Sequence, residues 1–408
     1  MLRLAKETAG KPEATVFGVG RIAAAGDAAL ANGTLAHALE LDDDHRTGTV
    51  HPGAVVVPAA LAACEAVGAS GLTLVRAVVL GYEVMCRVGE AFGGRQFYAG
   101  FHPTGTCGVF GAAVAAGVAF GLDEDALVRA IGIAGTQASG LAEWRTDGSW
   151  IKRLHPGRAA QSGVLAARLA RHGFTGPATI LEGASGFLQA FSYQGYVETE
   201  AITRGLGSEL RALATAFKPY PCCRFSHGAV DLALGLYRDG IRPSTVRSAH
   251  LRIYKTDILN YAHRPATPVD AQFCLPFLAA VALVRGRVGL ADLTEASIHD
   301  VEVLALSDRI TIEEDPGFTT QYPQRYPTEL TVVTVDGTEL TRFNDCPSGD
   351  PEAPEYATDP GRLHREVEAK VRTLLAETGY GDRAEPLIRE ARALAEASDV
   401  MALATLVS

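Results

Sequence analysis

Apolar and small residues dominate the first half of the chain, where they recur at helical spacing and are interrupted by glycine. This pattern predicts a series of helices. The expected spans are 25–40, 53–68, 72–92, 106–121, 123–140 and 157–172. Gly108, Gly111 and Ala115 are small residues at three- and four-residue spacing. Because such residues let helix axes approach closely, we expect a packed all-helical domain.

Beyond residue 217 the pattern changes to an alternation of apolar and polar residues, which is typical of strands. The expected strands are 249–254, 301–306, 329–335 and 338–342, and the expected helices are 226–238, 270–285, 292–299, 361–377 and 384–397. Asp336-Gly337, between the last two strands, is a strong hairpin signal. The predicted fold is therefore mainly α with an α+β insertion.

The length of 408 residues is too great for one hydrophobic core and predicts more than one domain. We expect a helical domain over 1–217, completed by 351–408, and a smaller α+β lid domain over 218–350. The stretch 345–359 is rich in proline and acidic residues and is interpreted as a linker.

Charge and cysteine content narrow the class of protein. The formal net charge of −10 argues against a nucleic-acid partner. Seven cysteines without a CxxC pair are typical of buried thiols in a reducing compartment. No signal peptide is visible at the start, and the apolar stretch 98–122 is rich in glycine, so we interpret it as a buried helix. We expect a cytoplasmic protein without a membrane segment.

Three His-Pro dipeptides, at His51, His102 and His155, each precede a predicted helix of small residues. Proline is favoured in the first turn of a helix, so each histidine is expected at a helix N-terminus. The helix dipole lowers the pKa of an imidazole there and attracts anions. If the three helices begin on the same side, they form a pocket for a carboxylate. The alternative is that each His-Pro is only a variant N-cap.

An acidic run at 40–44 lies just before the first His-Pro. Asp42 and Asp44 are expected in a solvated turn. Two alternatives remain, a metal site and a carboxylate that orients a catalytic imidazole. No EF-hand spacing and no HExxH motif is present, so we expect no metal.

Two segments supply cations. Lys152, Arg153 and Arg158 surround the third His-Pro and are interpreted either as a carboxylate clamp or as a surface charge run. The segment 218–227 lies where the domains are expected to join, and ligands often bind between domains. The adjacent Cys222 and Cys223 are expected to be packed thiols. Without a GxGxxG, Walker A or GxSxG motif, chemistry without a cofactor is expected.

Several of these segments together resemble the MmgE/PrpD family, which includes 2-methylcitrate dehydratases, cis-aconitate decarboxylases and iminodisuccinate epimerases. The segments that carry the resemblance are 32–37, 41–43, 51–53, 81–84, 100–104, 152–157, 217–227 and 270–274. The resemblance implies a helical domain built from both ends of the chain, an inserted α+β lid, an active site in the cleft and a homodimer.

The resemblance also implies a set of site residues. The catalytic candidates are Asp43, His51, His102 and Lys152. The resemblance places the segment 218–227 on the lid side of the pocket. The candidates for binding a small carboxylate substrate are Lys218, Tyr220, Cys223, Arg224 and His227 from this segment, and Arg153 and His155 from the region of the third His-Pro.

We expect a cofactor-independent lyase that acts next to a carboxylate of a small di- or tricarboxylate, in the first place a dehydratase resembling 2-methylcitrate dehydratase. In this mechanism His102 removes the α-proton, His51, oriented by Asp43, protonates the departing hydroxyl, and Lys152 holds the carboxylate. The same groups would support epimerisation or decarboxylation of a related acid, and these remain alternatives.

Two departures from the family motivate a further alternative, a catalytically silent relative that binds a metabolite. Phe277 stands near a position where relatives carry a tyrosine. Relatives also carry a segment ahead of the position of Met1, so we expect that this sequence is either truncated or lacks the first helices of the family.

Overall fold

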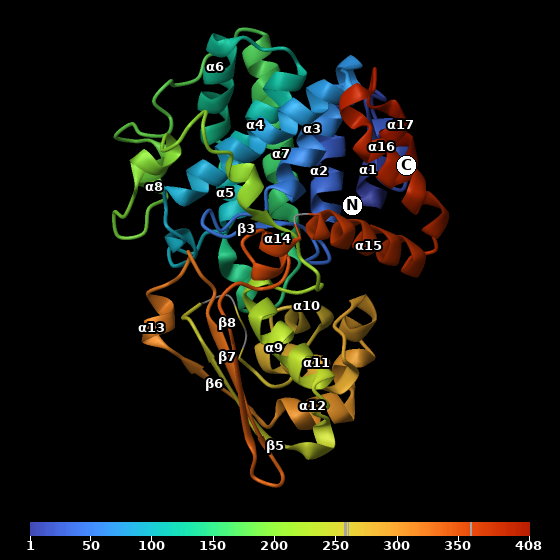
Figure 1. The fold of residues 1–408 in the computed structure, drawn as a ribbon. Coiled ribbons are helices and arrows are strands. Elements are labelled where there is room, and N and C mark those ends of the chain that lie inside the picture. Colours follow the sequence, from blue (N-terminus) through green and yellow to red (C-terminus); the bar gives the residue numbers. More distant parts are fainter. Residues whose placement is uncertain (257–258, 260, 360) are drawn as a thin grey trace.

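The computed structural model describes residues 1–256, 259, 261–359 and 361–408. Its first part is a bundle of helices (Figure 1). The helices are α1 (Leu2–Glu7), α2 (Ala25–Ala36), α3 (Gly53–Val67), α4 (Gly71–Glu90), α5 (Pro103–Ala119), α6 (Glu124–Gly135), α7 (Ile151–Arg171) and the short α8 (Phe187–Ala190). Two short pairs of strands join them, β1 (Ala14–Val16) with β2 (Gly20–Ala23), and β3 (Asp44–His45) with β4 (Thr215–Ala216).

Small residues set the distances between these helices. A Cβ atom on Gly157 of α7 would lie 2.3 Å from the carbonyl oxygen of Leu30 in α2. One on Gly163 would lie 2.3 Å from the Cβ of Ala112 in α5. Helix α7 is therefore held against both α2 and α5 at distances that only glycine permits, and this packing fixes the position of its first turns.

The second part is a mixed sheet with helices (Figure 1). The strands are β5 (Val246–Ile253), β6 (Ile310–Glu314), β7 (Thr328–Thr334) and β8 (Glu339–Asn344), in the order β6-β5-β7-β8, with β5 and β6 parallel and the other pairs antiparallel. Burial alternates along β7, as expected for a sheet with one covered face. The helices are α9 (His227–Arg238), α10 (Pro268–Ala271), α11 (Leu275–Arg285), α12 (Val301–Ser307) and α13 (Pro316–Thr319).

The C-terminal segment returns to the helical bundle (Figure 1). It comprises α14 (Pro354–Thr358), α15 (Arg362–Glu377), α16 (Ala384–Arg392) and α17 (Met401–Leu406). The amide of Gly18 donates to the carbonyl of Val407, the amide of Gly71 donates to that of Ala397, and Val400 is buried in the bundle core. The predicted fold class, mainly α with a smaller α+β part, is confirmed. Among the helices in the described ranges, none is long and apolar enough to cross a membrane.

The structure corrects several predicted elements. Residues 301–306, expected as a strand, form α12, because the Asp300 side chain accepts from the amides of Glu302 and Val303 and caps a helix. The expected helix 292–299 is two short 3₁₀ turns, and β6 was not predicted. The expected linker 345–359 is largely packed, with Cys346, Asp350 and α14 in its course.

A further correction concerns the third His-Pro. Helix α7 begins at Ile151, so Pro156 lies inside it and His155 does not stand at a helix N-terminus. Pro156 removes one backbone donor, which would have bonded the carbonyl of Lys152, and the helix continues through it. The other two His-Pro pairs do precede helices: His102 is the N-cap of α5, and Pro52 is the N-cap of α3.

Candidate active site

Four imidazoles meet where α2, α3, α5 and α7 approach one another. The ring centre of His37, the C-cap of α2, lies 5.1 Å from that of His51 and 5.6 Å from that of His102. The centres of His51 and His102 are 6.4 Å apart, and those of His102 and His155 are 5.2 Å apart. The structure therefore brings the three His-Pro histidines together and adds His37.

His102 and His155 form a hydrogen-bonded pair. Their Nδ1 atoms are 3.1 Å apart, so one ring donates and the other accepts. His102 Nε2 is buried and has no hydrogen-bond partner among the described residues. Burial and the nearby Lys152 ammonium hold the pKa of His102 well below its usual value, and burial lowers the pKa of His155 to about 4. Both rings are thus neutral near pH 7, and His102 Nε2 is a base or a donor according to which ring carries the shared proton.

The tautomer of His51 follows from a single contact. Its Nδ1 lies 2.6 Å from the backbone carbonyl oxygen of Asp43, and a carbonyl can only accept. His51 Nδ1 therefore carries the proton, and the neutral ring presents Nε2 as an acceptor. Burial and the neighbouring Lys218 hold the pKa of His51 well below its usual value. The resting form of His51 is thus a base.

The Asp43 carboxylate does not orient His51 as expected. It accepts from the Tyr82 hydroxyl at 2.6 Å and from the Gly53 amide at 2.8 Å, at the start of α3. Burial raises the pKa of Asp43 to about 7. The carboxylate of Asp42 is instead hydrogen-bonded to the imidazole of His37, with Oδ2 and Nδ1 2.5 Å apart.

The acidic run is buried, which contradicts the expectation of a solvated turn. Glu40 and Asp44 are each 3% exposed. The two carboxylate oxygens of Glu40 pair with different ammonium groups, that of Lys152 and, at 3.0 Å, that of Lys218. Lys218 is also 3.6 Å from Asp42, and these carboxylates raise its pKa against the effect of burial. Two lysines from distant parts of the chain are thus fixed beside the imidazoles.

A small cavity of about 20 Å³ lies at the centre of this cluster. It is lined by Glu40, Asp44, Thr49, His51, Phe97, His102, Lys152, Cys223, Arg224, Phe225 and Phe273. This volume holds about one water molecule, so the cavity is closed to any larger ligand. Five of the predicted site residues line it, and His155 and Lys218 lie directly behind through their contacts with His102 and Glu40.

The other predicted site residues do not line this cavity. The Asp43 side chain is held by Tyr82 and Gly53, as described above. Arg153 lies over the ring of Trp150, at 5.2 Å. The Tyr220 hydroxyl donates to Asp231 at 2.7 Å, and His227 lies between Arg224 and the carbonyl of Cys222.

Comparison with known protein families identifies the family to which the chain belongs. Residues 1–200 match the MmgE/PrpD N-terminal domain, and residues 220–395 match the MmgE/PrpD C-terminal domain. The chain belongs to the MmgE/PrpD family. The resemblance stated from the sequence motifs is thereby confirmed.

Several curated members of the MmgE/PrpD family are similar to this chain. A cis-aconitate decarboxylase of Aspergillus terreus is 28% identical over 358 residues, which cover 82% of this chain and 73% of that protein. The human cis-aconitate decarboxylase is 27% identical over 393 residues, covering 93% and 78%. A 2-methylcitrate dehydratase of Salmonella typhimurium is 26% identical over 239 residues, covering 55% and 48%. These relatives are enzymes.

Sequence reasoning missed two members of the cluster, His37 and Glu40. His37 ends one of the motifs that carry the resemblance to the MmgE/PrpD family, but it lies inside the expected helix 25–40 and is not followed by a proline. Glu40 begins the acidic run 40–44, and nothing in the sequence distinguishes it from the aspartates that follow. Phe277, the noted departure from the family, is fully buried in α11 and does not line the cavity. In the described part of the chain, no group of three or more His, Cys, Asp and Glu residues is arranged to hold a metal ion.

Proposed function

We propose that this protein is a lyase that acts next to a carboxylate of a small di- or tricarboxylate, using its own side chains for proton transfer. The observation that carries the proposal is the cluster of buried imidazoles beside the paired ammonium groups of Lys152 and Lys218. His51 Nε2 and His102 Nε2 supply proton acceptors or donors. Lys152 and Arg224 line the same cavity and supply positive charge for carboxylates.

The first reaction to consider is decarboxylation of an unsaturated tricarboxylate such as cis-aconitate. The bond between carbon and the departing carboxylate breaks, CO₂ leaves, and the electron pair stays on carbon. That charge spreads through the double bond into a remaining carboxylate, which Lys152 stabilises electrostatically. A proton then completes the product. His102 Nε2 donates it in the tautomer whose Nδ1 accepts a hydrogen bond from His155, and solvent returns a proton to His102 afterwards.

The share of this chain that each relative matches supports placing decarboxylation before dehydration. The matches to cis-aconitate decarboxylases span 82% to 93% of this chain in the two examples above, against 55% for the dehydratase. Dehydration of a 2-methylcitrate-like acid is the second candidate, favoured by the similarity to that dehydratase. In that reaction His51 or His102, as neutral bases, removes the α-proton, and a second group protonates the leaving hydroxyl.

A product assay tests the proposal. The protein is incubated with cis-aconitate, 2-methylcitrate and iminodisuccinate in separate reactions, and each is followed by ¹H NMR. We expect cis-aconitate to lose one carboxylate. Dehydration of 2-methylcitrate instead would select the second candidate. No turnover in a broad panel of di- and tricarboxylates would refute the proposal, and thermal stabilisation by one of them would then indicate a silent binding relative.

A further inference from the structure

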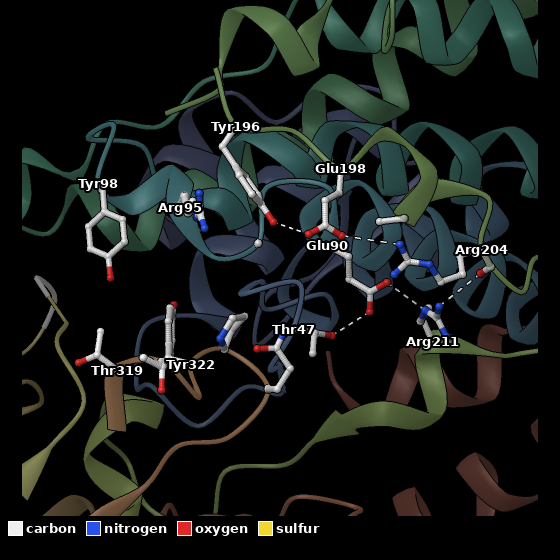
Figure 2. A pocket seen from close by; sticks show the side chains of 15 residues that line it. Thr47, Glu90, Arg95, Tyr98, Tyr196, Glu198, Arg204, Arg211, Thr319 and Tyr322 are labelled. Atoms are coloured by element: carbon white, nitrogen blue, oxygen red, sulfur yellow. Dashed lines mark hydrogen bonds and ion pairs between the residues drawn. The ribbon is translucent and has the colours of Figure 1, made fainter. Parts of the chain in front are cut away.

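A second cavity of about 510 Å³ lies between the helical part and the loop that follows α13 (Figure 2). Arg95, Tyr98 and Tyr196 come from the helical part of the chain, and Thr319 and Tyr322 come from the other part. Figure 2 shows Arg95 and Tyr98 on one side of the open space and Thr319 and Tyr322 on the other. This outer cavity is large enough for a small organic acid.

The charges of the outer cavity leave one cation in excess. Arg211 pairs with Glu90 at 3.0 Å, and Arg204 lies 3.7 Å from Glu198. Arg95 is exposed and lies 3.5 Å from the centre of the Tyr196 ring, and it forms no ion pair within the described ranges. The Tyr196 hydroxyl donates to Glu198, which keeps this ring in place beneath the guanidinium. In a chain of net charge −10, a guanidinium held in this way marks a place for an anion.

Aromatic side chains lie between the outer cavity and the inner one. Tyr322 lines the outer cavity, and its ring centre is 5.8 Å from that of Phe225, which lines the inner cavity. Phe97 also lines the inner cavity, with its ring 6.1 Å from that of His102, whereas Arg95, two residues earlier, lines the outer cavity. At Tyr322 and Phe225, therefore, two neighbouring rings connect the lining of one cavity with that of the other.

The inner cavity has room for about one water molecule, so a substrate can reach the imidazoles only after the side chains that line this cavity move. We propose that the outer cavity is a docking site for a small polycarboxylate anion, held by Arg95, from which the substrate enters past Tyr322 and Phe225. The docking step rests on the proposed function for the identity of its anion. Arg95 is a binding residue of the entrance and takes no part in the chemistry.

Direct binding tests the site separately from turnover. In a Lys152→Met variant, which disables the inner cavity, we expect calorimetric titration with citrate to detect one weak site whose affinity falls as salt increases. Adding Arg95→Gln should weaken this binding about three- to tenfold. Adding Arg76→Gln instead, at an exposed position of α4, should leave it unchanged.

The outcomes separate the two proposals. Absence of citrate binding to the Lys152→Met variant, or binding that Arg95→Gln does not alter, overturns the docking site even when the wild-type protein is active. Arg95-dependent binding in a protein that turns over no polycarboxylate upholds the site and refutes the proposed function. Should the Lys152→Met variant not fold, Arg95→Gln in the wild-type background is expected to weaken the salt-dependent binding of citrate by the same three- to tenfold, and unchanged binding there would overturn the docking site.

A blocking variant tests the route. Thr320 lines the outer cavity and is exposed, so Thr320→Trp fills the space without reaching the imidazoles. We expect kcat/KM to fall at least fivefold. Gln321→Trp, at the adjacent exposed residue that does not line the cavity, is the matched control and should retain the wild-type value. Wild-type kcat/KM in a folded Thr320→Trp protein would exclude this route.

Discussion

Glu40 adopts a backbone conformation that residues other than glycine rarely adopt. Its φ of 52° lies in the left-handed region, which costs a non-glycine residue roughly 1 kcal/mol. Its carboxylate lies between the ammonium groups of Lys152 and Lys218. The strain is maintained because this carboxylate satisfies two buried cations at once, and strained residues of this kind are concentrated at functional sites.

Removing the charge of Glu40 is therefore expected to destabilise the protein. Glu40→Gln leaves two buried ammonium groups with less compensation and should lower the free energy of unfolding by about 3 kcal/mol. Urea denaturation measures the change. Glu7→Gln, at an exposed position of α1, should alter it by less than about 0.5 kcal/mol. Equal stability of the two variants would mean that Glu40 does not neutralise the lysines.

His102 is the residue on which proton transfer depends most. His102→Gln keeps a side chain of similar size but cannot exchange a proton, so turnover should fall at least about a hundredfold. His172→Gln, an exposed histidine that follows α7, is the matched control and should retain wild-type turnover. Turnover within a few fold of wild type in the His102 variant would remove this imidazole from the mechanism.

At the scale of elements, α7 is the helix whose placement matters most to the site. It carries Lys152 and His155 in its first turns and is fixed against α2 by the contact of Gly157 with Leu30. Because a protein core transmits such packing changes, a displacement of α7 would move both side chains relative to His102.

A methyl group at Gly157 tests this dependence. Gly157→Ala would overlap the carbonyl of Leu30, so it should cost about 1–3 kcal/mol of stability and also reduce turnover. Gly235→Ala, on α9, meets no atom within 4 Å and should instead stabilise the helix by roughly 0.5–1 kcal/mol. Thermal unfolding and the product assay measure both effects. A neutral Gly157→Ala variant would contradict the role assigned to this contact.

The helices and strands also show which parts of the structure could be predicted from the sequence. The helices rich in small residues were predicted well, because apolar and small residues repeat at helical spacing over many residues and glycine marks several of their ends. The apolar and polar positions at 301–306 fit a strand and a helix equally well. The Asp300 side chain, which caps the first turn, stabilises the helix. In the site, His51 and His102 were predictable from the His-Pro signal. The partners of Glu40 were not, because Lys152 and Lys218 lie more than a hundred residues away in sequence.

At the scale of the whole molecule, buried titratable groups couple stability to pH in two opposite directions. Burial lowers the pKa of His155 to about 4, so the unfolded chain takes up a proton between pH 6.5 and 4 that the folded protein does not, and acid destabilises the fold. Burial raises the pKa of Asp43 to about 7, so the folded protein binds a proton between pH 7 and 4, and acid stabilises the fold there.

Two variants should therefore change the pH dependence with opposite signs. Relative to wild type, His155→Gln should lose less stability as pH falls from 6.5 to 4.5, because it removes the destabilising protonation. Asp43→Asn should lose more stability on acidification from pH 7, because it removes the stabilising one. Calorimetric melting temperatures at pH 7, 6 and 5 measure the slopes. Parallel slopes for all three proteins would contradict the burial of these groups in neutral form.

The central claim is that buried imidazoles transfer a proton at a carbon next to a carboxylate. The most direct test is turnover of cis-aconitate in D₂O, with the product analysed by NMR and mass spectrometry. The account predicts a product in which one solvent deuterium occupies the carbon next to a remaining carboxylate, at a rate that falls at least about a hundredfold in His102→Gln. A product without solvent deuterium, or a deuterated product formed equally fast by the variant, would contradict it.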